Sequence, residues 1–114
     1  FEFVAIHAPD FAQTHYYRAL LRESSGDLPG ALAMYRQAIA IDPEDYRSLF
    51  NQALILIDTN GDHSAGIQAL RAALRANPQL ERAFIYLGRS LVFVANPDNY
   101  PEAESVLLQG IDLI

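Results

Sequence analysis

The segment Asn77-Pro78-Gln79 is the third copy of a short motif that decides the fold of this chain. The earlier copies are Asp42-Pro43-Glu44 and Ala8-Pro9-Asp10, and successive prolines lie 34 and 35 residues apart. Each copy follows a stretch of periodically spaced apolar residues. A fixed period of this length is typical of repeat proteins, in which copies of one small unit stack side by side. The sequence therefore predicts three stacked units.

Each period contains two stretches with the apolar spacing of a helix and a turn between them. Two of the turns contain a glycine, Gly26 or Gly61, followed by an aspartate that can cap the next helix. Pro29 and Pro101 suit the first turn of a helix, where a missing N–H costs nothing. The predicted helices cover residues 10–24, 28–41, 46–59, 63–76, 80–95 and 100–113.

The apolar and small residues of the periods follow a definite order. The third period reads Phe84-x2-Leu87-Gly88-x2-Leu91, and then Ala103-x3-Leu107 with Gly110 three residues later. The matching second-helix residues of the earlier periods are Ala31, Tyr35 and Ala38, and then Gly66, Leu70 and Ala73. In this order the chain resembles the tetratricopeptide repeat (TPR) family, whose unit has the pattern W-x2-L-G-x2-Y, A-x3-F and a proline.

The resemblance implies an all-α fold, a right-handed superhelical solenoid of antiparallel helix pairs with three TPR units. The units are expected to cover residues 10–44, 45–79 and 80–114 in one continuous domain, with residues 1–9 as the end of a preceding repeat helix. The chain is then expected to be a piece of a longer protein. Its last helix lacks the polar capping helix that terminal repeats usually need, so we expect further repeats or a partner to cover it.

Several residues depart from the family pattern. His15 and Arg18 stand where the family has an aromatic residue and a leucine, and Leu54 replaces a small residue. About three extra residues fall in the 94–100 loop. Leu54 leaves the register of the second unit open by one residue.

Composition excludes several classes of function. The chain has 114 residues and a net charge of −6, and its eight basic residues, all arginine, are spread singly along it, which argues against a nucleic-acid partner. The most apolar stretches, 53–57 and 91–95, are far shorter than the ~20 residues of a membrane span. Without cysteine there is no disulfide framework and no thiol chemistry. Arginine without lysine, with abundant Ala and Leu, indicates a bacterial source, while the compartment, cytoplasmic or periplasmic, stays open.

The sequence predicts no enzyme, no metal site and no cofactor. Asp62-His63-Ser64 contains the residue types of a hydrolase triad, but adjacent side chains at a helix start cannot form its hydrogen-bond chain, so Asp62 is interpreted as a cap. The segment 58–62 imitates the start of a calcium loop, yet Ala69 stands where a bidentate glutamate would close it. Phosphate-loop and hydrolase motifs are absent from the sequence.

The resemblance also implies a function. In the TPR family, the first helices of successive pairs line a concave groove that holds a peptide or a partner helix. Carried onto this chain, the groove residues are Tyr16, Leu20, Glu23, Asn51, Ile55, Asp58, Arg82, Ile85, Tyr86 and Arg89. Tyr16 and Tyr86 are expected to act as apolar anchors, Asn51 to pair with peptide backbone, and Arg82 and Arg89 to pair with acidic groups. The prediction is a non-catalytic protein-interaction scaffold.

One family subtype is disfavoured by charge. Members that clamp the carboxy-terminal carboxylates of heat-shock chaperones place lysine, asparagine and arginine at positions that hold Tyr16, Leu20, Asn51 or Gln52, Arg82 and Tyr86 here. Too few cations converge at these positions for two carboxylates.

Two alternatives stay open. The chain could self-associate through its uncapped ends as a structural array, forming a homo-oligomer. It could also be an accessory TPR domain of a bacterial envelope assembly or secretion factor, a sensor or an enzyme.

Overall fold

The computed structural model describes residues 8–94 and 97–113, and this part of the chain is helical without strands. The elements are α2 (Ala8–Ser24), α3 (Leu28–Ile41), α4 (Tyr46–Asp58), α5 (His63–Ala76), α6 (Glu81–Phe93), the short 3-10 helix η1 (Pro97–Asn99) and α7 (Tyr100–Leu113). The six α-helices predicted from the sequence are confirmed, with ends that differ by at most two residues. Residues 1–7, expected to end a preceding repeat, lie outside the described residues, and Ala8 and Pro9 form the first turn of α2.

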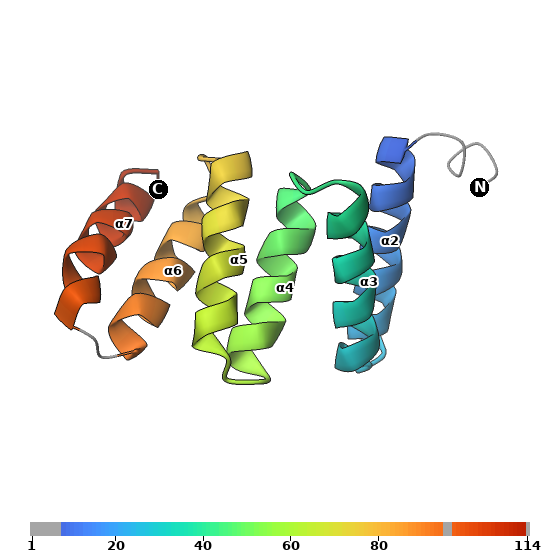
Figure 1. Ribbon diagram of the computed structural model, residues 1–114, viewed down its shortest axis with the longest axis horizontal. Coiled ribbons are helices and arrows are strands. Elements are labelled where there is room, and N and C mark those ends of the chain that lie inside the picture. The colour runs from blue at the N-terminus through green and yellow to red at the C-terminus, as the bar shows by residue number, and fades with distance from the viewer. Residues whose placement is uncertain (1–7, 95–96, 114) are drawn as a thin grey trace.

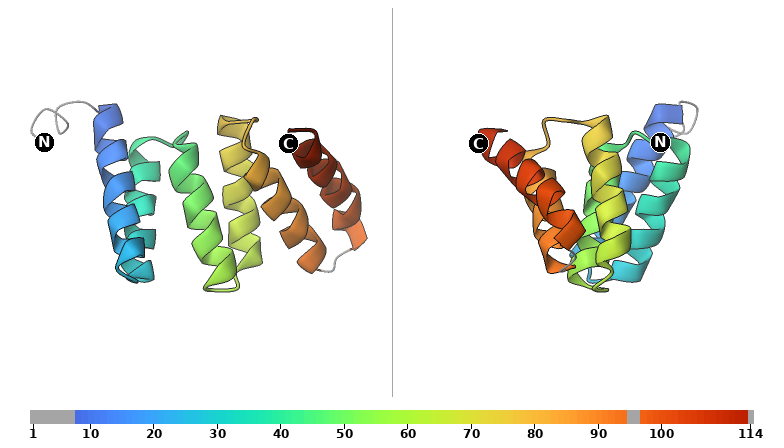
Figure 2. Two further views of the ribbon diagram at one scale, coloured as in Figure 1. Left: turned by 180° about the vertical axis from the view of Figure 1, so that it is seen from behind. Right: turned by 60° about the vertical axis from the view of Figure 1, so that its left-hand side comes forward.

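The helices form three antiparallel pairs, α2 with α3, α4 with α5, and α6 with α7, arranged in a row (Figure 1). The row is elongated, with extents of 50 × 26 × 22 Å, and α2 and α7 lie at its opposite ends. Seen from behind, the first helices of the pairs, α2, α4 and α6, face the viewer (Figure 2, left). This arrangement is an all-α helical repeat solenoid.

The turns inside the first two pairs use the residues that the sequence singled out. Gly26 and Gly61 have φ of 86° and 67°, the left-handed region that other residues avoid. Asp27 caps α3 by accepting a hydrogen bond from the Gly30 N–H at 3.0 Å, and Asp62 caps α5 by accepting one from Ala65 at 3.1 Å. The Gly30 N–H, followed by the Arg22 guanidinium, holds the pKa of Asp27 below its ordinary value. In the third pair, η1 takes up part of the longer connection.

The turns between pairs repeat one another. Asp42 Oδ1 accepts a hydrogen bond from the Glu44 N–H at 3.0 Å, and Asn77 Oδ1 accepts one from the Gln79 N–H at the same distance. In each case the intervening residue is the proline of the repeat. The side-chain bond across the proline mimics a backbone turn, so the chain leaves one pair and enters the next in the same way.

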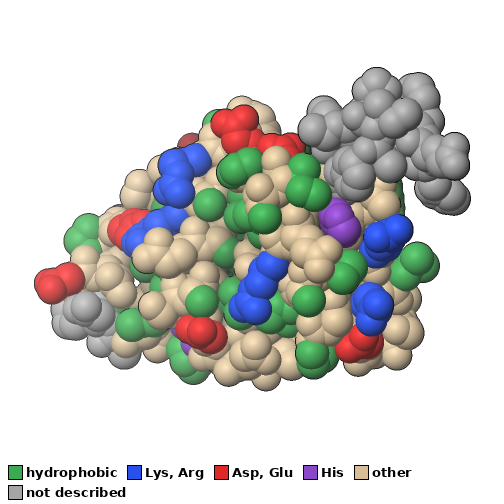
Figure 3. Space-filling view, turned by 45° about the vertical axis from the view of Figure 1, so that its right-hand side comes forward, with side chains coloured by type: hydrophobic (Ala, Val, Ile, Leu, Met, Phe, Trp, Pro, Cys, Tyr) green, Lys and Arg blue, Asp and Glu red, His purple; other side chains and the backbone are tan. Residues whose placement is uncertain are grey.

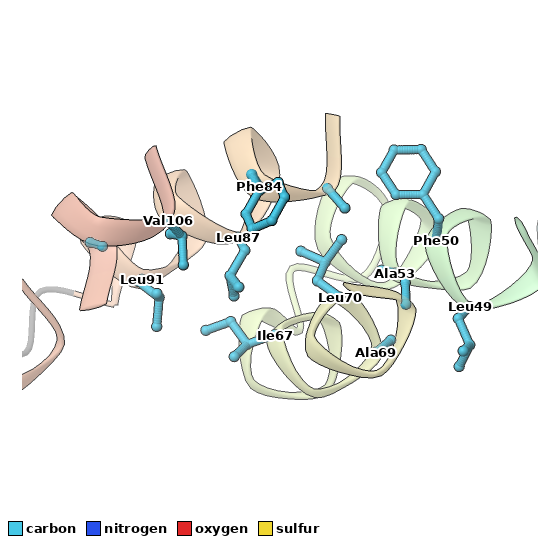
Figure 4. Packing of buried hydrophobic residues seen from close by; sticks show 13 residues of the cluster. Leu49, Phe50, Ala53, Ile67, Ala69, Leu70, Phe84, Leu87, Leu91 and Val106 are labelled. Carbon is cyan, nitrogen blue, oxygen red and sulfur yellow. The ribbon is translucent and has the colours of Figure 1, made fainter. Parts of the chain in front are cut away.

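The core is divided into two clusters of buried apolar residues. The larger one joins α4, α5, α6 and α7, and Figure 4 shows its side chains filling the space between these helices. The smaller one joins the first pair to α4 and contains Ala19, Ala31, Leu32, Tyr35, Ile55 and Leu56. Two residues that depart from the family pattern are accommodated by the packing around them. Leu54 packs against the larger cluster, and His15 is half-buried. Burial, followed by the nearby Arg18, lowers the pKa of His15.

Glycines let the paired helices approach closely. A Cβ atom at Gly88 of α6 would lie 2.4 Å from Leu107 Cγ of α7, and one at Gly66 of α5 would lie 2.3 Å from Ile57 Cγ1 of α4. Both separations are far below van der Waals contact, so each glycine is required by packing.

We therefore expect Gly88→Ala to lower the free energy of unfolding by about 1–3 kcal/mol, the usual cost of overpacking a core. The cost should shrink in a Leu107→Ala background, because the atom that the new methyl group meets is then gone. Urea unfolding followed by circular dichroism measures both values. Equal costs in the two backgrounds would contradict the close approach of α6 and α7 at this point.

Candidate functional site

A groove of about 420 Å³ lies on the side of the solenoid that α2, α4 and α6 share. We call it the central groove. It lies at the amino-terminal ends of α4 and α6, where the turn after Pro78 brings Gln79 and Leu80 to its edge. Its lining residues are Tyr16, Tyr46, Arg47, Phe50, Asn51, Gln79, Leu80, Glu81 and Arg82. All three helix pairs therefore contribute to one site.

Two arginines of the central groove lie over aromatic rings. Arg47 Cζ is 4.4 Å from the ring centroid of Tyr16, and Arg82 Cζ is 5.3 Å from that of Phe50. Both distances are within the range of a cation–π interaction, which orients the guanidinium group over the ring. Arg47 Nε lies 4.0 Å from Asp45, whereas Arg82 has no ion-pair partner within residues 8–94 and 97–113. The groove thus presents oriented positive charge beside aromatic surface.

The buried hydroxyl of Tyr35 connects the groove to the core. Tyr35 is fully buried on α3, and its hydroxyl donates a hydrogen bond to the Glu23 carboxylate and accepts one from Asn51 Nδ2 at 3.2 Å. Burial, followed by the hydrogen bond to Glu23, raises the pKa of Tyr35 well above its ordinary value. The network joins α2, α3 and α4, and it holds Glu23 and Asn51, two of the predicted groove residues, in place.

A smaller hollow of about 110 Å³ lies between α4, α5 and α6. Asp58, Tyr86 and Arg89, all predicted groove residues, line it together with His63 and Phe93. Arg89 Cζ is 5.6 Å from the Tyr86 ring centroid. The rings of His63 and Phe93 are stacked with their centroids 4.1 Å apart.

The predicted groove residues therefore fall into different places. Tyr16, Asn51 and Arg82 meet in the central groove, and Asp58, Tyr86 and Arg89 meet in the smaller hollow. Ile55 is only 6% exposed, because α4 turns this side chain into the smaller core cluster. Ile85 and Leu20 are half-buried, and Glu23 is engaged by Tyr35.

The groove residues predicted from the sequence do not include Tyr46, Arg47 or Phe50, which also line the central groove. Arg47 could have been found, because it lies four residues before Asn51 and so shares its side of the helix. Phe50 occupies the aromatic packing position of the repeat, and its ring centroid lies 5.9 Å from that of Tyr86 in a T-shaped arrangement. No sequence signal indicated that its ring would also lie beneath Arg82.

Charge is dispersed over the molecule. On the face that Figure 3 shows, arginine side chains lie interspersed with hydrophobic and acidic ones. In the described part of the chain, His, Asp and Glu side chains form no cluster of three that could hold a metal ion. Nor is any helix there both long enough and apolar enough to cross a bilayer.

The Tyr35 network leads to a stability prediction. Tyr35→Phe removes the hydroxyl and leaves Glu23 and Asn51 without this partner, so we expect a loss of about 1–3 kcal/mol in the free energy of unfolding. Tyr100→Phe is the matched control, because Tyr100 is half-exposed on α7 and we expect a change within about 0.5 kcal/mol. Urea unfolding compares the two, and equal stability of both variants would rule out an energetic role for the network.

Two curated relatives share sequence with this chain. The Photosystem I assembly protein Ycf3 of Cyanophora paradoxa is 33% identical over 100 residues, and the probable biofilm formation methyltransferase WspC of Pseudomonas putida is 32% identical over 74 residues. The matches cover 86% and 65% of this chain. They span 53% and 17% of the relatives, so the chain corresponds to only part of each.

Solved structures share the architecture. The second TPR of Spaghetti (RPAP3), bound to the HSP90 peptide SRMEEVD, superimposes with a TM-score of 0.83 over the full length of both chains at 17% identity. The crystal structure of MamA gives a TM-score of 0.80 at 18% identity, covering 97% of this chain and 62% of that one. At these identities the likeness concerns the fold.

A family model described as "Tetratricopeptide repeat" matches residues 1–46 and 16–81, well over half of the chain. Together with the repeated prolines, the three helix pairs and the close approaches at glycine, this match shows that the chain belongs to the tetratricopeptide repeat family, whose fold serves protein interaction.

Proposed function

We propose that the central groove binds an extended segment of a partner protein that carries acidic side chains. The observation that supports this most is the convergence of Tyr16, Phe50 and Arg82 from three helix pairs on one open groove. Aromatic residues and arginine supply much of the binding energy at protein interfaces, and a guanidinium can hold a carboxylate through two parallel hydrogen bonds.

Each lining group has a distinct role in this proposal. Arg47 and Arg82 pair with carboxylates of the partner, while the exposed edges of Tyr16 and Tyr46 receive its apolar side chains. Asn51 retains its carbonyl oxygen and a second N–H for peptide backbone, because Tyr35 takes only one of its donors. Glu81 at the groove edge disfavours a carboxylate next to it and so helps to set the register of the ligand. The smaller hollow, with Tyr86 and Arg89, extends the contact surface.

The proposed role is binding without catalysis. The similarity to the methyltransferase WspC covers only 17% of that protein. The name of Ycf3 states an assembly role, and a binding scaffold can fill such a role. We therefore propose that the chain is a binding part of a larger protein or complex. A role as an accessory domain of an assembly factor is compatible with this proposal.

An array of synthetic decapeptides that differ in acidic and apolar content tests the proposal. We expect acidic peptides with apolar residues to bind, and Arg82→Glu to weaken them about tenfold or more, because a carboxylate then meets a like charge. Tyr16→Ala should also weaken binding. The matched control is Arg75→Glu, an exposed α5 position outside the groove, which should leave affinity unchanged. Fluorescence anisotropy gives the affinities, and equal effects of Arg82→Glu and Arg75→Glu would refute binding in the groove.

A further inference from the structure

Most of the exposed large apolar side chains in the described part of the chain lie on the two end helices, α2 and α7. Leu21 on α2 is 71% exposed, and Leu108 and Ile111 on α7 are 55% and 58% exposed. Tyr17 lies on α2 and Tyr100 on α7, and Val92 of α6 lines a hollow together with α7. Phe93 faces the smaller hollow instead, and Ile41 lies on α3. Exposed apolar side chains that gather at one end of a molecule suit an interaction surface.

The end formed by α7, which we call the tail, is apolar and acidic. A hollow of about 410 Å³ there is lined by Val92, Tyr100, Ala103, Glu104, Leu107 and Leu108. Glu104 is the charged residue of this lining. The sequence of α7 contains Glu102, Glu104 and Asp112 and no basic residue.

The end formed by α2, which we call the head, is apolar and basic. A hollow of about 440 Å³ there is lined by Arg18, Leu21, Arg22, Ser25 and Met34. Arg22 is bound to Asp27 at 3.0 Å, whereas Arg18 has no ion-pair partner in the described part of the chain.

The basic character of the head is specific to the first unit. One repeat later in the sequence, Arg18 and Arg22 correspond to Ala53 and Ile57, and two repeats later they correspond to Leu87 and Leu91. These internal residues pack in the larger core cluster. The head therefore has charge where the internal first helices have apolar packing.

We propose that the head of one copy docks on the tail of another, with Arg18 against the carboxylate of Glu104 and Leu21 against Leu108. Inside the chain, the second helix of one pair already packs on the first helix of the next, as α3 does on α4 and α5 on α6. Docking α2 of a second copy on α7 continues this order. An arginine–carboxylate pair also joins neighbouring units within the chain, because Arg71 of α5 binds Glu102 of α7 through two hydrogen bonds of 3.1 and 2.5 Å.

Charge decides between this arrangement and a symmetric dimer. Tail against tail would pair two surfaces that each carry Glu104, and head against head would pair two that each carry Arg18, so like charge disfavours both. Head against tail places opposite charges in contact. Such a junction joins two different surfaces, so the two copies that meet in it are not related by a two-fold axis.

Sedimentation velocity over the micromolar concentration range tests the proposal. We expect the average mass of the native chain to rise with concentration, and Arg18→Glu and Glu104→Arg each to weaken association about tenfold. An equimolar mixture of the two variants should regain association, since the reversed head of one fits the reversed tail of the other. This recovery also shows that both variants are folded.

The control variant for self-association is Arg82→Glu, which lies in the central groove and should leave the association of copies unchanged. Conversely, Arg18→Glu should leave the affinity for peptides unchanged. The two proposals can thus fail separately. A native chain that stays monomeric at every concentration overturns head-to-tail docking, as does a mixture of the two charge-reversed variants that associates no better than either alone. Leu108→Glu should also abolish association, and retained association in that variant would place the contact elsewhere.

Discussion

The spacing between paired helices is set by residues that have almost no side chain, and the rest of the solenoid depends on it. At Gly66, Gly88 and Gly110 the opposite helix comes so close that a single added carbon would collide with Ile57, Leu107 or Phe84. The α4–α5 and α6–α7 pairs are therefore narrow, and side chains of α2, α4 and α6 form one groove.

The elements could be predicted from the sequence because their signals are local. Asp27 and Asp62 start helices through hydrogen bonds to backbone three residues away, and Gly26 and Gly61 end them through backbone freedom. The groove could be predicted only in part. Ile55 and Asn51 lie one turn apart on α4, yet Ile55 is buried by the first pair, and how far α3 covers α4 depends on packing between units. The contact between Arg47 and Tyr16 had no signal in the sequence, since the two residues belong to different units.

Asn51 belongs to the groove and to the Tyr35 network at once. Its amide is oriented by a hydroxyl that is itself buried and bound to Glu23, so a ligand would meet a side chain with little rotamer freedom left to lose. Stacking has the same effect on Arg47 and Arg82, whose long side chains would otherwise lose much entropy on binding. Preorganisation of this kind favours affinity without adding contacts.

The division of the core into two clusters has a consequence for the dynamics of the chain. The helix α4 contributes Leu49, Phe50 and Ala53 to the larger cluster, and Ile55 and Leu56 to the smaller one. Repeat arrays of this kind open in steps, since each unit is held only by its neighbours. The α2–α3 pair can therefore open as one unit while α4 to α7 remain folded, and its amide hydrogens would then exchange with solvent sooner than those of the larger cluster. That partial opening would remove Tyr16 from the groove and release any bound segment without global unfolding.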